Sequence, residues 1–251
     1  MEEYILNFIL FLHFIFGDKV RTITMNENLA LIYQSLPYLL KGCTITIGLV
    51  GGALGLGFII GVPMAVGQVY GNKYLSGLIS LYVWFFRGLP ELVLLFLFYF
   101  GLFSLIGLNL SAFTAAILVL GLRSAAYQSQ IFRGSIQSLS EGQMLAALSL
   151  GMKKYEAILY IILPQTLRIS IPGWSNEYSI ILKDSAITYA IGVTELLTRG
   201  NFIVARTYKP LPIFLTCAAI FLILTYGGVK LLSLLENKVK IPGYGERRGE
   251  I

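Results

Sequence analysis

The chain has 251 residues, of which 56% are hydrophobic and only 13% are charged, and its formal net charge is +6. Soluble domains carry about 25% charged residues, so this composition excludes an ordinary soluble domain and indicates an integral membrane protein with one membrane domain. It also argues against binding to nucleic acid, because no basic face is long enough to follow a phosphate backbone.

Few residues are available for covalent chemistry. His13 is the only histidine, so neither a histidine-based metal cluster nor a Ser-His-Asp triad can be built, and we expect no metal site and no catalytic residue. The chain has no Gly-x-x-x-x-Gly-Lys-Ser/Thr loop, so any ATP and Mg²⁺ that drive it must be bound by another chain. Cys43 and Cys217 both lie in apolar runs, which favours packing over a disulfide.

Apolar runs predict an all-α fold with about five transmembrane helices. The first run, residues 42–72, carries no charge and contains glycine pairs four residues apart at 48/52, 51/55 and 57/61. This spacing lets a neighbouring helix approach closely. The other predicted spans are residues 75–105, broken at 87–91, and residues 111–131, 165–191 and 210–232. Residues 194–208 between the last two predict a surface helix on the outer side.

The distribution of charge predicts the orientation. Most basic residues outside the spans fall in segments that five spans place on one side, which the positive-inside rule identifies as the cytoplasm. The N-terminus is then outside and the C-terminus is cytoplasmic. Residues 5–16 are apolar but too short to span, and Glu2 and Glu3 argue against a cleaved signal. We therefore predict an interfacial helix in residues 1–28, a transmembrane domain at 29–240 and a basic tail at 241–251.

A polar segment between two spans, residues 137–164, predicts a pair of short helices. Leu145 to Leu150 favours a helix that Gly151 ends with a left-handed cap. Lys153 to Leu163 favours a second helix, which the backbone bias before Pro164 closes. Such an elbow forms a knob that fits a groove on a soluble partner.

The spacing in this segment is that of a known loop. Ala146-Ala147, three residues, Gly151, nine residues, then Ile161 and Leu163-Pro164 resembles the coupling loop of ABC importer permeases. From about Leu36 to Pro242 the chain resembles the polar amino-acid permeases of type I ABC importers, the glutamine/histidine/arginine group. The other motifs that carry this resemblance are Arg87-Gly88-Leu89-Pro90, Ala125-Ala126-Tyr127, Phe132-Arg133-Gly134, Glu141-Gly142-Gln143, Asn176-Glu177-Tyr178, Leu182-Lys183-Asp184-Ser185 and Ile191-Gly192-Val193.

Some positions depart from the family pattern. Leu145 stands where the coupling loop usually has Glu, and Gln130 where the motif around Tyr127 usually has Glu. Leu89 replaces a usual Thr, and Glu91 replaces a usual apolar residue, which adds a carboxylate near the expected pathway.

The resemblance implies a function and a set of partners. It implies the permease fold of type I ABC importers, dimerisation with a second copy or a homologue, and a cytoplasmic ATPase dimer that binds the coupling loop. It also implies that an extracytoplasmic binding protein delivers an amino acid, and that the chain lies in a prokaryotic plasma membrane. The residues expected to contact the ATPase are Ala146, Ala147, Leu148, Gly151 and Met152.

Charges inside the spans indicate where the amino acid binds. A charge in a span costs at least about 2.5–3.5 kcal/mol and requires a partner or water. Arg87 suits the carboxylate of a zwitterion and Asp184 its ammonium, with Ser185 as a neighbouring hydroxyl. Glu91 favours polar or cationic side chains, and Glu177 is either a gate or a structural partner. The alternative is internal ion pairing, of Arg87 with Glu91 one turn later and of Lys183 or Arg168 with another carboxylate.

Two other functions explain part of the sequence. An ion-coupled secondary transporter or a channel explains the charges in the spans but gives no reason for an elbowed helix pair. An intramembrane hydrolase lacks a nucleophile with a visible base. The sequence therefore favours an ATP-driven permease that is not itself an enzyme.

Overall fold

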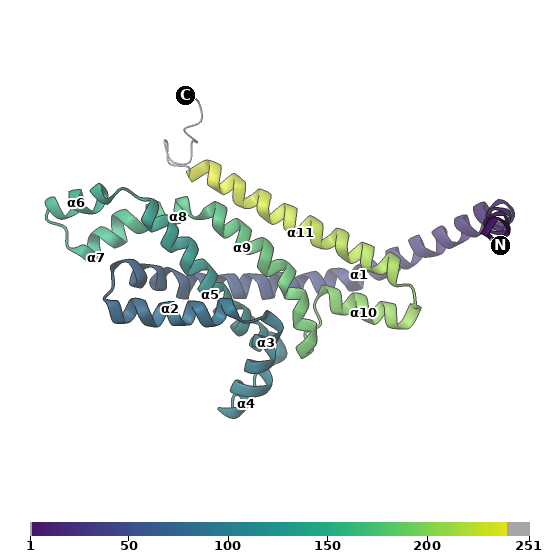
Figure 1. The fold of residues 1–251 in the computed structure, drawn as a ribbon, viewed down its shortest axis with the longest axis horizontal. Helices are drawn as coiled ribbons and strands as arrows, with labels where there is room; N and C mark the ends of the chain where they lie inside the picture. The colour runs from purple at the N-terminus through teal and green to yellow at the C-terminus, as the bar shows by residue number, and fades with distance from the viewer. Residues whose placement is uncertain (1, 240–251) are drawn as a thin grey trace, which may run out of the picture.

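A computed structural model describes residues 2–239, with side chains described from Asn26 onward. All regular elements in this range are helical (Figure 1). In chain order they are α1 (Glu2–Tyr70), α2 (Lys73–Gly88), α3 (Glu91–Phe96), η1 (Leu97–Leu102), α4 (Phe103–Leu105), α5 (Ala112–Ser138), α6 (Glu141–Ser149), α7 (Lys154–Ala157), η2 (Ile158–Ile162), α8 (Leu163–Ile169), α9 (Ile171–Asp184), η3 (Ser185–Ile191), α10 (Leu196–Thr207) and α11 (Pro210–Val239).

Helix α1 is longer than the sequence predicts. It runs without a break through residue 28, where the sequence predicts the end of a separate interfacial helix. The relation of residues 1–28 to the membrane surface stays a prediction, and the predicted tail at 241–251 lies outside the described residues.

Length and apolar composition single out fewer spans than the predicted five. Among the described residues, Asn26–Tyr70 and Pro210–Val239 meet both criteria. A third span is added if Lys73–Gly88 and Glu91–Leu105, which meet at a bend of 107°, form one crossing. Helix α5 is 27 residues long but carries many polar side chains, and the predicted span at 165–191 is divided among α8, α9 and η3.

Glycines in α1 set the packing against α5. Gly48 and Gly52 face Phe113 and Ile117, and Gly61 faces the α5 backbone so closely that a Cβ there would lie 3.2 Å from the Ala125 carbonyl oxygen. The predicted close approach at 48/52 and 57/61 is confirmed. The pair 51/55 faces open space instead, so its spacing does not mark a contact within this chain.

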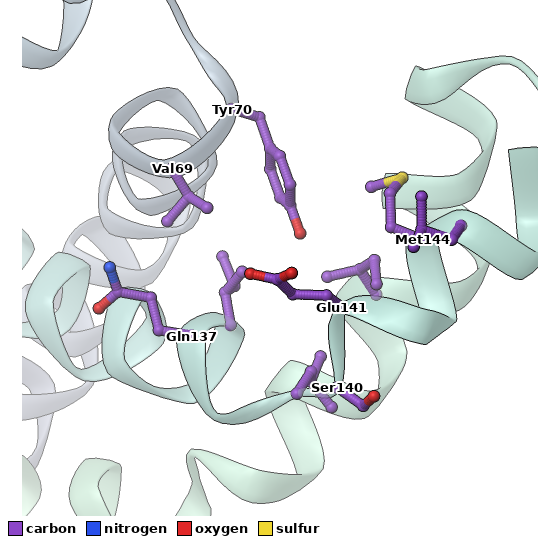
Figure 2. A pocket seen from close by; sticks show the side chains of 10 residues that line it. Val69, Tyr70, Gln137, Ser140, Glu141 and Met144 are labelled. Atoms are coloured by element: carbon purple, nitrogen blue, oxygen red, sulfur yellow. The ribbon is translucent and has the colours of Figure 1, made fainter.

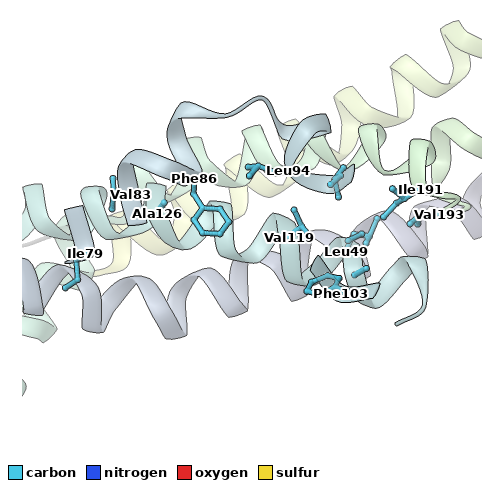
Figure 3. Packing of buried hydrophobic residues seen from close by; sticks show 13 residues of the cluster. Leu49, Ile79, Val83, Phe86, Leu94, Phe103, Val119, Ala126, Ile191 and Val193 are labelled. Carbon is cyan, nitrogen blue, oxygen red and sulfur yellow. The ribbon is translucent and has the colours of Figure 1, made fainter. Parts of the chain in front are cut away.

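An apolar cluster joins the helices that carry the charged residues. It includes Phe86 from α2, Leu94 from α3, Val119 from α5 and Ile191 from η3, all buried (Figure 3). Glu91 precedes Leu94 by less than one turn, and Arg123 of α5 follows Val119 by about one turn. The cluster therefore fixes the relative positions of their side chains.

The predicted elbow is present at one end of the bundle (Figure 1). Ser140 caps α6 by accepting a hydrogen bond from the Gly142 N–H at 3.3 Å. Gly151 has φ +83°, the left-handed conformation expected of a helix-ending glycine. The Met152 N–H then donates to the Ala147 carbonyl across the elbow at 3.2 Å.

The prediction that Pro164 closes the second helix is wrong. The backbone stays right-handed helical from α7 through η2 into α8, and Pro164 lies in the first turn of α8. The π-helical hydrogen bonding of η2, directly before Pro164, is the local change that accompanies a residue without an N–H.

The predicted surface helix at 194–208 is confirmed as α10, although its side of the membrane stays a prediction. The Glu195 carboxylate caps it by accepting hydrogen bonds from the N–H groups of Leu197 and Thr198 at 2.8 and 2.7 Å. Cys43 and Cys217 are free, buried members of an apolar cluster between α1, α10 and α11, so both serve as packing residues.

Candidate functional site

A sharp bend separates Arg87 from Glu91. Arg87 lies in the last turn of α2 and Glu91 begins α3, and Leu89 is extended as expected before a proline. Because the chain turns by 107° here, the two residues do not share one helix face. An Arg87–Glu91 ion pair is not observed among the described residues, and Glu91 pairs with another residue.

That residue is Arg123 of α5. Its Nη1 lies 3.2 Å from Glu91 Oε2 and 2.8 Å from Asp184 Oδ2, so one guanidinium joins the start of α3 to the end of α9. The side chains of Glu91, Arg123 and Asp184 are 5%, 14% and 22% exposed. At this burial the attraction between opposite charges is much stronger than in water.

Tyr127, one turn after Arg123 on α5, brings Arg87 to the same place. The guanidinium carbons of Arg87 and Arg123 lie 4.8 and 4.9 Å from the centroid of its ring. Both distances are in the range of a cation–π interaction. No ion pair joins Arg87 to a carboxylate in the described structure. The N–H groups of its guanidinium therefore remain available to bind an anion.

Glu177 belongs to a buried polar network next to these residues. Its Oε1 accepts a hydrogen bond from Ser124 Oγ at 2.7 Å, and Gln128 Nε2 donates to that Oγ at 3.0 Å. Gln128 Nε2 also donates to the Leu54 carbonyl, and Gln128 Oε1 accepts from Trp174 Nε1 at 2.8 Å. The network joins α1, α5 and α9. This favours a structural role for Glu177, rather than a gate, in this conformation.

The remaining residues named from the sequence take no part in these ionic contacts. Ser185 is buried, and its hydroxyl donates to the Leu182 carbonyl at 2.7 Å, so its proton is committed to the backbone. Lys183 lines an apolar hollow with Leu197 and Phe214. Neither Lys183 nor Arg168 forms an ion pair among the described residues, so the proposed internal pairing of these two is not observed.

One oxygen of the cluster has no partner. Glu91 Oε1 is buried and accepts no hydrogen bond in the described structure. Leaving such an acceptor unsatisfied costs about 1–3 kcal/mol. The charged cluster, defined as Arg87, Glu91, Arg123, Glu177 and Asp184, contains three carboxylates and two guanidinium groups, a formal excess of one negative charge. It can therefore accept a donor that carries positive charge.

The coupling loop forms a second candidate site, away from the charged cluster. A cavity of about 450 Å³ lies between the end of α1, the end of α5 and α6, and Figure 2 shows Tyr70 and Glu141 pointing into it. Of the predicted contact residues, Ala146, Leu148 and Gly151 are exposed and Met152 is half-buried. Ala147 is only 1% exposed, so it packs inside the loop.

Sequence reasoning missed Arg123 as a site residue, although a signal was present. Arg123 is the only charged residue in the predicted span at 111–131. A lone charge in a span demands a partner, and Glu91 and Asp184 are carboxylates in the neighbouring predicted spans. Tyr127 carried part of the family resemblance, but nothing in the sequence indicated that two arginines share its ring. No group of His, Cys, Asp and Glu side chains in the described range could hold a metal ion.

These features define a polytopic α-helical membrane protein with a buried charged site and a projecting loop of two short helices. The chain belongs to the family of binding-protein-dependent transport system inner membrane components, whose model matches residues 53–241. Members of this family are permease subunits of ABC transporters and have no catalytic activity of their own.

Individual relatives cover most of the chain. It is 34% identical to the nopaline transport system permease protein NocM of Agrobacterium fabrum, over 83% of this chain and 90% of that relative. It is 32% identical to the histidine/lysine/arginine/ornithine transport system permease protein HisM of Salmonella typhimurium, over 80% of this chain and 89% of that relative.

A solved structure supports the same assignment. The permease of an amino acid ABC transporter crystallised with histidines is 34% identical and superposes with a TM-score of 0.74, over 82% of this chain and 96% of that one. The permease fold predicted from the sequence is confirmed. The MetNI methionine ABC transporter in an inward-facing conformation has the same TM-score at 19% identity, which shows a shared fold.

Proposed function

We propose that this chain is the membrane-spanning subunit of an ATP-driven importer that takes up amino acids with polar or basic side chains. The relatives are named for the transport of nopaline, glutamine and histidine/lysine/arginine/ornithine. The observation that carries the proposal is the charged cluster, which combines a guanidinium without a carboxylate partner, on Arg87, with a buried carboxylate oxygen without a donor, on Glu91.

The cluster offers a group for each charge of a basic amino acid. The Arg87 guanidinium presents several donors in a plane and suits the substrate carboxylate. Asp184 suits the substrate ammonium, because Arg123 Nη1 contacts only its Oδ2 and its other carboxylate oxygen forms no ion pair in the described structure. Glu91 Oε1, which lacks a donor, suits a polar or cationic side chain.

The partners follow from family membership. A second copy or a homologue completes the pathway, and an extracytoplasmic binding protein delivers the substrate. A cytoplasmic ATPase dimer, which binds ATP and Mg²⁺, receives the exposed face of α6 in a groove.

We place the C-terminus in the cytoplasm of a prokaryotic cell and the N-terminus outside. ATP binding brings the two coupling loops together, so the permease halves rock and expose the site on alternate sides.

Reconstituted transport tests this proposal. The chain, its ATPase and its binding protein are placed in liposomes, and uptake of radiolabelled arginine and glutamine is measured with and without ATP. We expect uptake that needs both ATP and the binding protein. Uptake driven by an ion gradient in the absence of ATP would identify a secondary transporter instead.

A further inference from the structure

We propose that Arg123 is the resident counter-cation of the substrate site. Its guanidinium lies between Glu91 and Asp184, where the cationic side chain of a basic amino acid would lie during transport. The inference rests on the proposed function and deepens it, because it names basic amino acids as the preferred substrates and Arg123 as the residue that sets this preference.

The contact geometry suits a displaceable cation. Both carboxylates lie within ion-pair distance of one nitrogen, Arg123 Nη1, at 3.2 and 2.8 Å. The strongest arginine–carboxylate pairs are instead bidentate, with two parallel N–H···O bonds to one carboxylate. A shared single nitrogen holds each carboxylate by one contact, which an incoming ammonium or guanidinium can replace.

The charge balance leaves a place for a second cation. Arg123 cannot neutralise Glu91 and Asp184 together, and Glu177 lies within electrostatic range of Arg87, Arg123 and Asp184. Glu91 also keeps its buried, unpartnered Oε1 while Arg123 is in place. A cationic side chain supplies both the missing charge and the missing donor, whereas a neutral side chain supplies no charge.

Tyr127 provides a position for Arg123 when it is displaced. The Arg123 guanidinium carbon already lies 4.9 Å from the centroid of the Tyr127 ring. It can keep this cation–π contact while giving up its carboxylate partners. A neutral amino acid brings only its α-ammonium, which can use the other oxygen of Asp184, so it does not have to displace Arg123.

Direct binding measurements test the inference. The complex of the chain with its ATPase, without the binding protein, is placed in lipid nanodiscs, and the dissociation constants for L-arginine and L-glutamine are measured. Removing the resident cation in Arg123→Gln should raise the preference for arginine over glutamine about tenfold, the factor that corresponds to about 1.4 kcal/mol. Arg133→Gln, which removes a cation from α5 almost three turns away, is the matched control and should leave the preference unchanged.

Each result decides the question. An unchanged or lowered preference for arginine in Arg123→Gln overturns the inference, because it would make Arg123 a scaffold or a ligand of the substrate carboxylate. If Arg123→Gln does not fold, Arg123→Lys decides by the same ratio, since a shorter ammonium holds both carboxylates less well. Wild-type protein that binds both amino acids with no change in Arg123→Gln leaves the proposed function standing. Wild-type protein that binds neither overturns both.

Discussion

Arg123 Nη1 lies 2.8 Å from Asp184 Oδ2, and this pair joins the middle of α5 to the C-terminal end of α9. The two residues are 61 positions apart in the chain. Since Arg123 also holds Glu91 at 3.2 Å, the first residue of α3 is tied to the same point. Any movement of α3 or α9 relative to α5 must break or exchange one of these contacts. The charged cluster is therefore placed where a change in helix packing and a change in ligand binding are coupled.

The first prediction concerns the substrate preference of Glu91. Glu91→Gln keeps an acceptor for Arg123 but removes a buried negative charge. We expect arginine uptake to fall about tenfold or more, because a hydrogen bond to a charged group contributes about 1.5–3 kcal/mol. Glutamine uptake should fall much less. Both are measured in liposomes as initial rates per amount of folded protein.

The control for this prediction separates substrate binding from folding. Glu236→Gln removes a carboxylate from the end of α11, away from the cluster, and should leave both uptake rates unchanged. If Glu91→Gln lowers folded yield and the uptake of both amino acids in proportion, Glu91 has a structural role only.

Arg87→Lys should impair the uptake of both amino acids, because an ammonium lacks the planar donors that suit a carboxylate.

The second prediction concerns the close contact of α1 with α5. Gly61→Leu should destabilise the protein by about 1–3 kcal/mol, because the new side chain has no room beside the Ala125 carbonyl. Gly51→Leu is the matched control, since the space beside Gly51 is open. Thermal unfolding can be followed by a thiol-reactive dye, because Cys43 and Cys217 are buried and free. Equal transition temperatures for the two variants would contradict this packing.

The sequence predicted the helical class, the elbow and the surface helix because each depends on local signals. Gly151 adopts the left-handed conformation that its position after a short helix requires, and α10 begins at a capping Glu195. The same reasoning failed at Pro164, because a proline in the first turn of a new helix is tolerated and η2 continues the chain into it.

The charged cluster was only partly predictable. The cost of charges in a span identified Arg87, Glu91 and Asp184 as residues that need partners, and the structure brings all three to one place. Which partner each takes depends on the 107° bend between α2 and α3 and on the rotation of α5, and neither follows from local sequence. For the same reason Ser185 was predicted to face the substrate, whereas its hydroxyl bonds the Leu182 carbonyl.

The third prediction concerns orientation in the membrane. With Cys43 and Cys217 replaced by Ala, single cysteines are introduced at Lys153 in the elbow and at Arg206 in α10, both exposed positions. A membrane-impermeant maleimide added to intact cells should label Arg206→Cys and not Lys153→Cys. Inside-out vesicles should give the opposite result. Labelling of Lys153→Cys from outside would reverse the proposed topology and remove the elbow from the reach of a cytoplasmic ATPase.

The fourth prediction uses two neighbouring alanines of α6 to separate partner contact from loop folding. Ala146 is exposed and Ala147 is only 1% exposed, so the same change acts differently at the two positions. Ala146→Asp places a carboxylate on the surface and should leave thermal stability unchanged. If this surface enters the ATPase groove, substrate-stimulated ATP hydrolysis in the reconstituted complex should be lost, because the carboxylate must then be desolvated.

Ala147→Asp should also abolish stimulated ATP hydrolysis, but for another reason. Ala147 is buried, so a carboxylate there loses its hydration, and an uncompensated buried charge should destabilise the loop by about 3–5 kcal/mol. The transition temperature should therefore fall in Ala147→Asp and not in Ala146→Asp. Ala146→Ser, which adds one hydroxyl, is the control that should keep both stability and coupling. Full stimulation of ATP hydrolysis in Ala146→Asp would show that the exposed face of α6 is not the contact, whatever the behaviour of Ala147→Asp.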